Sequence, residues 1–278
     1  MAEGTESTPH TYPQGVPSWV ELVTPDLEHA TQFYGRLFGW TFEDAMPPGA
    51  PEPYLVAKLR GKDAAGIVRG DGPQWITYIA VDDADATSRR AVGAGATLIE
   101  APADAGAGGR WSEIRDPRGA TFRLWQAGDR LGSQVNNAPG SWNFSDLHTD
   151  DLDAGLAFYR GLFGWEVADM GPDADHTIRV PGYGDHLEST VDPDIRTRQA
   201  FAPEGFADAI GGAVRTHGTE APRWYVTFAV EDLVKSIDTL SLGGGEALDR
   251  RRTEWAFASD VIDPWGAGFA LSQFTPPS

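Results

Sequence analysis

Apolar and polar positions along the chain follow two periods, and their order predicts a repeating β-α-β-β-β unit. Residues 19–23 are typical of a strand, whereas the apolar residues over 26–38 recur every three or four positions and predict a helix. Gly39 is placed to end this helix. Three strands are predicted next, at residues 40–42, 54–59 and 65–68. The unit then repeats, with a strand at 75–81, a helix at 83–92 and strands near 97, 112–115 and 120–125.

Two sequence motifs occur twice, so this pair of units is itself duplicated. Residues 33–40 (FYGRLFGW) return 125 positions later as residues 158–165 (FYRGLFGW). Asp116-Pro-Arg-Gly returns 147 positions later as Asp263-Pro-Trp-Gly. The offset grows by 22 residues, which we assign to an insertion near residues 181–207. We therefore expect four β-α-β-β-β units paired into two domains, an α+β fold in which each mixed sheet curves round a pocket.

These offsets also divide the chain. The expected parts are a flexible tail (1–16), a first domain (17–128), a linker (129–140) and a second domain with the insertion (141–278).

Charge and composition exclude several classes of function. The chain has 41 acidic and 22 basic residues and a formal net charge of −19, which argues against binding to nucleic acid or to an anionic membrane surface. It has no cysteine, which excludes disulfides, thiolate catalysis and iron–sulfur clusters. The sequence holds no run of ~18 apolar residues and no signal-like leader, so we expect a cytoplasmic protein.

The repeated motifs resemble those of the vicinal oxygen chelate superfamily, which includes glyoxalase I, bleomycin-resistance proteins and extradiol dioxygenases. The resemblance rests on the helices that open at Asp26 and Asp151 and on the turns at Asp116 and Asp263. It implies two glyoxalase-like domains. The tandem form is similar to actinobacterial proteins labelled glyoxalase-like or hydroxylase, some of whose relatives act in antibiotic and aromatic-polyketide pathways.

The resemblance also implies positions for metal ligands. Counting from the family's landmarks puts six side chains there: Trp19, Arg123 and about Ile76 in the first copy, and Phe144, Ala270 and about Tyr225 in the second. None of these ligates Mg²⁺, Fe²⁺ or Zn²⁺ in the ordinary way, so we expect no metal and no other cofactor. A register shift of one residue would instead bring Glu21, or Asp146 and His148, nearer to the centre.

Strand alternation gathers aromatic and charged side chains on one face of the first copy. They are Trp19, Glu21, Tyr78, Arg123 and Trp125. This set suits the binding of a flat, oxygenated molecule, through stacking on tryptophan and hydrogen bonds from arginine. The alternative is a Glu21–Arg123 ion pair inside a filled barrel.

The same alternation gives the second copy a more reactive set. His148 can move protons near neutral pH, Asp146 can orient its ring, and Tyr225 can donate a hydrogen bond to a carbonyl oxygen. We take these three as candidate catalytic residues. Further substrate contacts are expected from Phe144, Thr227 and Ser272. The alternative for His148 is a cap on the following helix.

The insertion is expected to be a lid or a binding loop, or else to cover the domain interface. Taken together, these features predict a metal-independent tailoring enzyme of antibiotic biosynthesis that binds an aromatic, polyketide-like small molecule. Its acid–base chemistry would be enolisation, dehydration, cyclisation or carbonyl reduction. NADPH would need a site without the usual glycine fingerprint. The alternatives are a drug-binding sequestration or resistance protein and a metal-dependent glyoxalase or dioxygenase. Two fused copies are compatible with a monomer or a homodimer.

Overall fold

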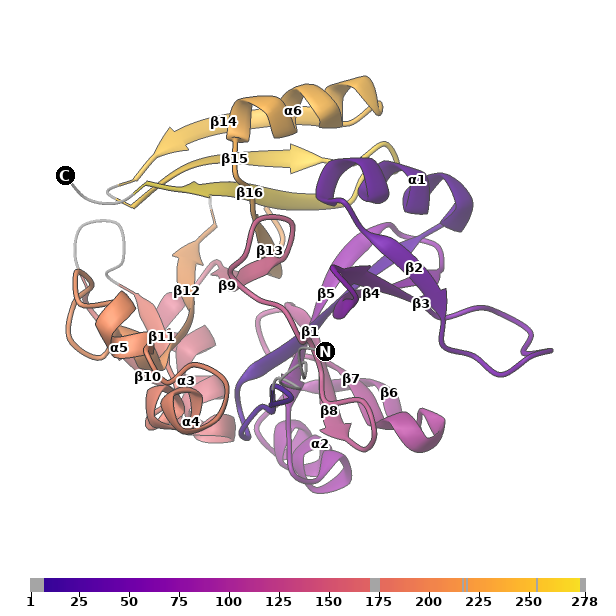
Figure 1. Ribbon diagram of the computed structural model, residues 1–278. Coiled ribbons are helices and arrows are strands. Elements are labelled where there is room, and N and C mark those ends of the chain that lie inside the picture. The colour runs from indigo at the N-terminus through magenta and orange to yellow at the C-terminus, as the bar shows by residue number, and fades with distance from the viewer. Residues whose placement is uncertain (1–7, 171–175, 217, 219, 254, 276–278) are drawn as a thin grey trace, which may run out of the picture.

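The computed structural model describes residues 8–170, 176–216, 218, 220–253 and 255–275. These residues form two eight-stranded mixed sheets (Figure 1). The strand orders are β2-β3-β4-β1-β5-β8-β7-β6 and β10-β11-β12-β9-β13-β16-β15-β14. Both orders place two β-α-β-β-β units side by side in one sheet. This confirms the expected α+β fold of four units in two domains.

The first domain carries eight strands and two α-helices. The strands are β1 (Pro17–Thr24), β2 (Thr41–Asp44), β3 (Leu55–Leu59), β4 (Lys62–Arg69), β5 (Gln74–Ala80), β6 (Thr97–Asp104), β7 (Gly109–Arg115) and β8 (Thr121–Ala127). The helices are α1 (Leu27–Phe38) and α2 (Ala84–Gly93), with a short η1 (Gly106–Gly108).

The second domain repeats this order and adds the insertion. Its strands are β9 (Trp142–Thr149), β10 (Glu166–Ala168), β11 (Thr177–Arg179), β12 (Ala209–Arg215), β13 (Arg223–Ala229), β14 (Glu246–Arg252), β15 (Ala256–Ile262) and β16 (Gly268–Phe274). The repeated helices are α3 (Leu152–Phe163) and α6 (Leu233–Leu242). The insertion holds α4 (Tyr183–Thr190) and α5 (Ile195–Arg198) and runs into η2 (Phe206–Asp208).

The ends of α1 and α3 follow from single residues. Asp26 accepts a hydrogen bond from the His29 backbone N–H at 3.2 Å, and this caps α1. Gly39 ends α1 with φ at 74°, a conformation that side chains other than glycine rarely adopt. Asp151 and Gly164 do the same for α3. The capping residues recognised in the sequence therefore act as expected.

Two hydrophobic cores are shared between the domains, whereas a third, smaller cluster around Trp19 and Tyr78 belongs to the first domain alone. In one core, α1 contacts the second sheet, and the Phe38 ring lies 4.7 Å from that of Phe228 on β13. Figure 1 shows α1 beside α6. In the other core, Phe122 of β8 lies 5.5 Å from Tyr159 of α3. Neither domain can therefore bury its helix face without the other.

The two repeated motifs meet across this domain interface. The Tyr34 hydroxyl, in the first FYxxLFGW helix, donates to the second-domain Asp263 carboxylate at 2.9 Å. Tyr159 of the second copy donates to Asp116 of the first domain, also at 2.9 Å. Burial raises the pKa of both aspartates. The motifs that identify the repeat thus hydrogen-bond the two domains to each other.

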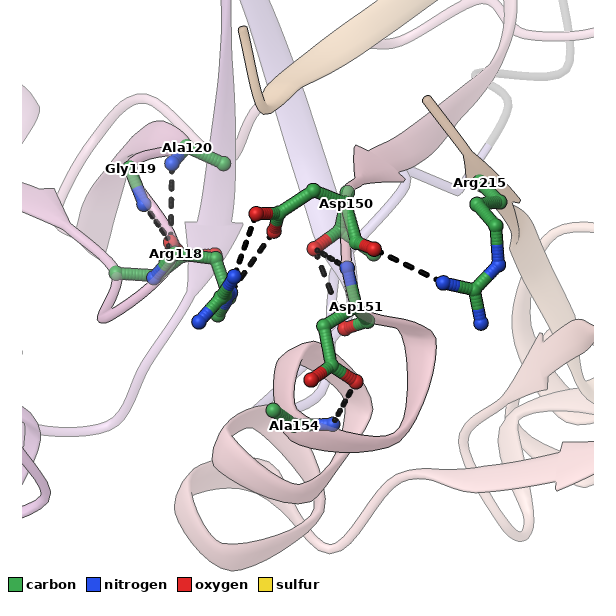
Figure 2. Close-up of polar contacts among 9 residues, drawn as sticks. Arg118, Gly119, Ala120, Asp150, Asp151, Ala154 and Arg215 are labelled. Atoms are coloured by element: carbon green, nitrogen blue, oxygen red, sulfur yellow. Dashed lines mark hydrogen bonds and ion pairs between the residues drawn. The ribbon is translucent and has the colours of Figure 1, made fainter. Parts of the chain in front are cut away.

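An ion pair lies next to one of these contacts. Figure 2 shows Arg118, in the β7–β8 turn of the first domain, reaching the Asp150 carboxylate with two nitrogens. The Arg118 Nε lies 2.8 Å from the nearer oxygen. Arg215 donates to the Asp150 backbone carbonyl at 2.9 Å. Asp150 directly precedes the Asp151 cap, so the start of α3 is held from both domains.

The N-terminal segment differs from the expected flexible tail. Residues 1–7 lie outside the described residues, but residues 8–16 lie against the linker and β5. The Tyr12 hydroxyl donates to the Ser133 carbonyl at 2.6 Å, and the Gly15 N–H donates to Ala80 at 2.8 Å. The sequence pattern could not show this, because polar, proline-rich segments look alike whether or not they find partners.

Candidate functional site

We call the face of each sheet opposite to its helices the inner face. On the first inner face, Glu21 is only 1% exposed and forms an ion pair with Arg123. Tyr78 donates to Glu21 at 2.8 Å and accepts from Arg123 at 2.7 Å. Arg123 also reaches Glu113 at 2.7 Å. The ion pair that we weighed as an alternative is therefore present.

Aromatic rings surround this ion pair. The Arg123 guanidinium lies 4.8 Å from the Trp111 ring and 5.4 Å from that of Tyr78. The Trp19 indole donates to Tyr54 at 2.9 Å. Burial raises the pKa of Tyr78 well above its usual value, and the Glu21 charge adds to this. The side chains predicted to bind substrate here are brought together, and they mostly contact one another.

On the second inner face, the structure brings the three candidate catalytic residues together. Asp146 lies opposite Tyr225 in the β9–β13 ladder, and His148 lies opposite Arg223. The His148 and Tyr225 rings are 5.0 Å apart. The Arg223 guanidinium lies 5.0 Å from the Tyr225 ring. Phe144 lies opposite Thr227 in the same ladder, two residues along from Asp146 and Tyr225.

Asp146 is half-buried and forms no ion pair among the described residues. One carboxylate oxygen accepts the Gly212 backbone N–H at 2.6 Å. Burial raises the pKa of the Asp146 carboxyl, an effect that this hydrogen bond and the nearby Arg251 partly oppose. Asp146 therefore keeps its proton to a higher pH than a surface aspartate does.

His148 has the opposite shift. Burial, together with the positive charge of Arg223, lowers the pKa of His148 to about 4. The ring is thus neutral at pH 7 and able to accept a proton. In the described part of the chain it has no hydrogen-bond partner, and the cap of α3 is Asp151 instead. The capping role considered for His148 therefore belongs to another residue.

Among the described residues, the Tyr225 hydroxyl already has a hydrogen-bond partner, unlike the His148 ring. This hydroxyl donates to the Phe269 backbone carbonyl at 2.9 Å, and burial raises its pKa well above the usual value. The hydroxyl oxygen can still accept a hydrogen bond, but its proton is already used. Ser272, on β16, lies opposite Ala258 at the far side of this face.

The two inner faces differ greatly in side-chain bulk. In the ladders of the first sheet, Tyr78 pairs with Arg123, and Trp111 pairs with Trp125. The matching pairs of the second sheet are Thr227 with Ala270, and Ala258 with Ser272. Four large side chains are thus replaced by small ones. We therefore take the second inner face as the candidate functional site.

Sequence reasoning missed three charged residues of this site. Arg251 on β14 pairs with Asp260 on β15 at 2.7 Å, and both influence the Asp146 carboxyl. Arg223 covers Tyr225 from β13. Strand alternation alone would have predicted that Asp260 shares a face with Ala258, and that Arg223 shares a face with Tyr225. The position of Arg251 depends on a bulge in β14, which no sequence pattern announced.

The insertion reaches the far end of the second sheet through an aromatic contact. The Phe201 ring lies 5.6 Å from Trp255, in the β14–β15 turn, and 5.8 Å from Phe274, at the end of β16. We call these three residues the aromatic clasp. The first domain has Gly108 and Ala127 at the places of Trp255 and Phe274. The clasp is therefore particular to the domain that carries the insertion.

The described residues set limits on two other classes of site. Nowhere among them do three histidine, aspartate or glutamate side chains come together as a metal site would require. No described helix is both long and apolar enough to cross a membrane.

Comparison with known proteins gives matches over almost the whole chain. The family profile described as Glyoxalase/Bleomycin resistance protein/Dioxygenase superfamily matches residues 17–124 and 143–271. "Putative glyoxylase CFP32" of Mycobacterium tuberculosis is 34% identical over 275 residues, with 95% of this chain and 97% of the relative covered. "Anthracycline biosynthesis protein DnrV" of Streptomyces peucetius is 32% identical over 276 residues, with 92% of each covered.

Solved structures share the fold at low sequence identity. The 2,3-dioxygenase LapB from Pseudomonas sp. KL28 aligns with a TM-score of 0.61 at 13% identity, covering 95% of both chains. The Mn(II)-bound glyoxalase from Novosphingobium aromaticivorans aligns with a TM-score of 0.59 at 14% identity, covering 94% of this chain and 83% of that one. At these identities the likeness concerns the fold alone.

Proposed function

The chain belongs to the Glyoxalase/Bleomycin resistance protein/Dioxygenase superfamily, and we propose that it is a small-molecule tailoring enzyme whose second inner face performs acid–base chemistry. The similarity to proteins named for anthracycline biosynthesis supports a tailoring role. The observation that carries the chemistry is that β9 places Asp146 and His148 on one face, opposite Tyr225 and Arg223. The raised pKa of Asp146 and the lowered pKa of His148 support their roles as acid and base.

These two groups suit proton transfer at a carbonyl compound. His148 takes a proton from the carbon next to the carbonyl, and Asp146 gives its own proton to the carbonyl oxygen, so the ketone becomes an enol. Transfer of the proton from the imidazolium to the carboxylate then restores both groups. Arg223 and Arg251 add positive charge where the oxygen becomes negative. A positioned acid or base of this kind contributes roughly 10²–10⁴-fold in rate.

We further propose an aromatic, polyketide-like substrate. The Phe144 side chain and the Tyr225 ring line the face that carries Asp146 and His148, and the aromatic clasp adds further rings at the end of the sheet. Flat aromatic molecules stack on such rings. Enolisation, and the dehydration or cyclisation that an enol permits, needs only proton transfer. Carbonyl reduction would also need a hydride donor.

The metal used by many relatives does not fit the side chains present. The ligand positions implied by the family hold tryptophan, arginine, phenylalanine and alanine. The nearby carboxylates of Glu21 and Asp260 are neutralised by Arg123 and Arg251. We therefore route no step through a metal. Metal independence is part of the proposal, and elemental analysis of the active protein, together with activity after chelation, tests it.

The decisive experiment measures proton exchange in a panel of hydroxylated anthraquinones and anthrones. We expect the wild-type protein to catalyse deuterium uptake from D₂O, detected by mass spectrometry, and to convert some of these compounds. His148→Ala and Asp146→Asn should lose roughly 10²-fold or more in rate. His29→Ala, at an exposed histidine on α1, is the control. Full activity in folded His148→Ala would refute the assignment.

Binding without catalysis is the second candidate function. One observation favours it, because Tyr225 spends its proton on a backbone carbonyl and leaves fewer donors for a substrate. Tight binding of a panel compound, recovered unchanged and without deuterium, would select this sequestration role.

A further inference from the structure

A groove on the helix side of the second sheet shares Arg251 and Ala258 with the inner face but lies beside α6. It lies between the start of α6 and the edge strands β14 and β15, with a volume of about 580 Å³. The lining side chains include Val234, Arg250, Arg251, Arg252 and Phe257. We call it the α6–β14 groove. Its size falls within the range of ~300–1,000 Å³ that is typical of small-molecule sites.

The groove combines unpaired positive charge with apolar surface. Within the described residues, Arg250 and Arg252 form no ion pair, whereas Arg251 is paired with Asp260. The Arg252 guanidinium lies 5.3 Å from the Phe257 ring. Val234 is 60% exposed and Phe257 is 38% exposed. Two guanidinium groups without a carboxylate partner in the described structure therefore lie beside exposed apolar side chains.

The first domain shows how the equivalent place is closed. There, Arg110 on β7 binds Asp85 on α2 at 2.6 Å and Asp104 on β6 at 2.7 Å. Counted from the capping aspartate of each helix, Asp85 corresponds to Val234 of the second domain. In the strand ladders, Arg110 corresponds to Phe257 and Asp104 corresponds to Arg252. The second domain thus has a cation, Arg252, on its edge strand where the first domain has the Asp104 carboxylate, and Val234 takes the place of the other carboxylate.

We propose that the α6–β14 groove binds a small amphipathic anion. Its carboxylate, sulfonate or phosphate group would be held by Arg250 and Arg252, because guanidinium groups bind oxyanions with paired hydrogen bonds. Its apolar or aromatic body would cover Val234 and Phe257. The negative charge of the bound anion would neutralise these arginines, as the carboxylates of Asp85 and Asp104 neutralise Arg110 in the first domain. This site does not depend on the chemistry proposed for the inner face.

The test uses the fluorescent dye 8-anilinonaphthalene-1-sulfonate, an aromatic sulfonate, titrated into the folded protein. We expect saturable binding close to one dye per chain. Arg252→Gln should weaken it at least about tenfold, the effect of losing a charge-assisted hydrogen bond. The double variant Val234→Asp/Phe257→Arg rebuilds the first-domain ion pair in the groove and should abolish binding.

Three controls keep the result specific. Arg160→Gln, at an exposed arginine on α3, should bind the dye as the wild type does. Neutral N-phenyl-1-naphthylamine should bind weakly and respond little to Arg252→Gln. Circular dichroism and thermal unfolding show that each variant is folded. The proposal is overturned if the wild type does not bind the dye, or if folded Arg250→Gln/Arg252→Gln binds it unchanged.

Discussion

The protonation of single side chains distinguishes the two inner faces. On the first, Glu21 and Arg123 neutralise each other and Tyr78 completes the network. On the second, Asp146 and His148 have no such partner, so burial acts on each of them directly and shifts their pKa values in opposite directions. The same backbone position thus holds a paired acid in one domain and an unpaired acid in the other.

The His148 shift can be measured directly. Its pKa is lowered from 6.5 to about 4 because burial disfavours the charged ring. In an NMR titration, the His148 ring resonance should therefore move with a midpoint near pH 4, and His148→Ala assigns the signal. The folded pKa lies below the unfolded one, so stability is fully present above pH 6.5 and falls between pH 6.5 and about 4. A midpoint near 6.5 would contradict the buried, neutral ring.

Replacing Arg123 tests the ion pair of the first inner face. Arg123→Met leaves the Glu21 carboxylate buried without its counter-charge. We expect the free energy of unfolding to fall by roughly 3–5 kcal/mol, as when one partner of a buried pair is removed. Urea unfolding measures this loss. The exposed control Arg160→Met should change little, and a loss below ~1 kcal/mol for Arg123→Met would argue against a buried charge.

Among the elements, the helices with the FYxxLFGW motif contact the opposite domain rather than only their own sheet. Tyr34 of α1 accepts the Trp75 indole N–H at 3.3 Å while its own proton goes to Asp263. The second copy repeats this with Trp224 and Tyr159. One helix therefore links its own sheet to the turn between two strands of the other.

Removing one hydroxyl should weaken this link. Tyr34→Phe leaves a buried oxygen of Asp263 without its donor, which typically costs about 1–3 kcal/mol. Tyr159→Phe should have a similar effect through Asp116. Tyr183→Phe is the matched control, because that hydroxyl only reaches His10 at 3.4 Å. Thermal unfolding compares the three, and equal melting temperatures for all of them would contradict the inferred role.

The aromatic clasp is the corresponding feature of the insertion. Phe201 is 46% exposed, yet it is the insertion residue that contacts Trp255 and Phe274. Phe201→Ala should release the chain around α5, so trypsin should cut faster after Arg196 and Arg198. Leu242→Ala, at a residue 90% exposed on α6, should leave the cleavage rate unchanged. Equal rates in both variants would indicate that the clasp does not hold the insertion.

At the scale of the whole molecule, the duplicated domains share two hydrophobic cores. Each core draws residues from both sheets, and Thr77 of β5 bonds Ser145 of β9 at 2.8 Å in the buried interface. The linker and residues 8–16 run beside each other along the first domain. The inner faces of the two domains nevertheless differ. Four large side chains in the first domain correspond to four small ones in the second.

The shared cores predict cooperative unfolding. Tryptophan fluorescence and circular dichroism should report one coincident transition in urea, because separating the domains exposes the apolar faces of both. Residues 141–278 expressed alone should aggregate or self-associate for the same reason. Two well-separated transitions, or a stable monomeric second domain, would contradict this.

The sequence by itself determined the local structure and the duplication. Asp26 and Gly39 mark the ends of a helix because capping needs only neighbouring backbone groups. Strand alternation likewise placed Asp146, His148 and Tyr225 on one face, since it depends only on the period of two.

Only the tertiary structure decided the contacts between distant residues and their charge states. The Tyr34–Asp263 bond joins residues 229 positions apart, and the clasp joins the insertion to two other elements. The lowered pKa of His148 and the unpaired arginines of the α6–β14 groove depend on which charges lie nearby and how much water is excluded. Those quantities are set by distances in space, which a local pattern along the chain does not contain.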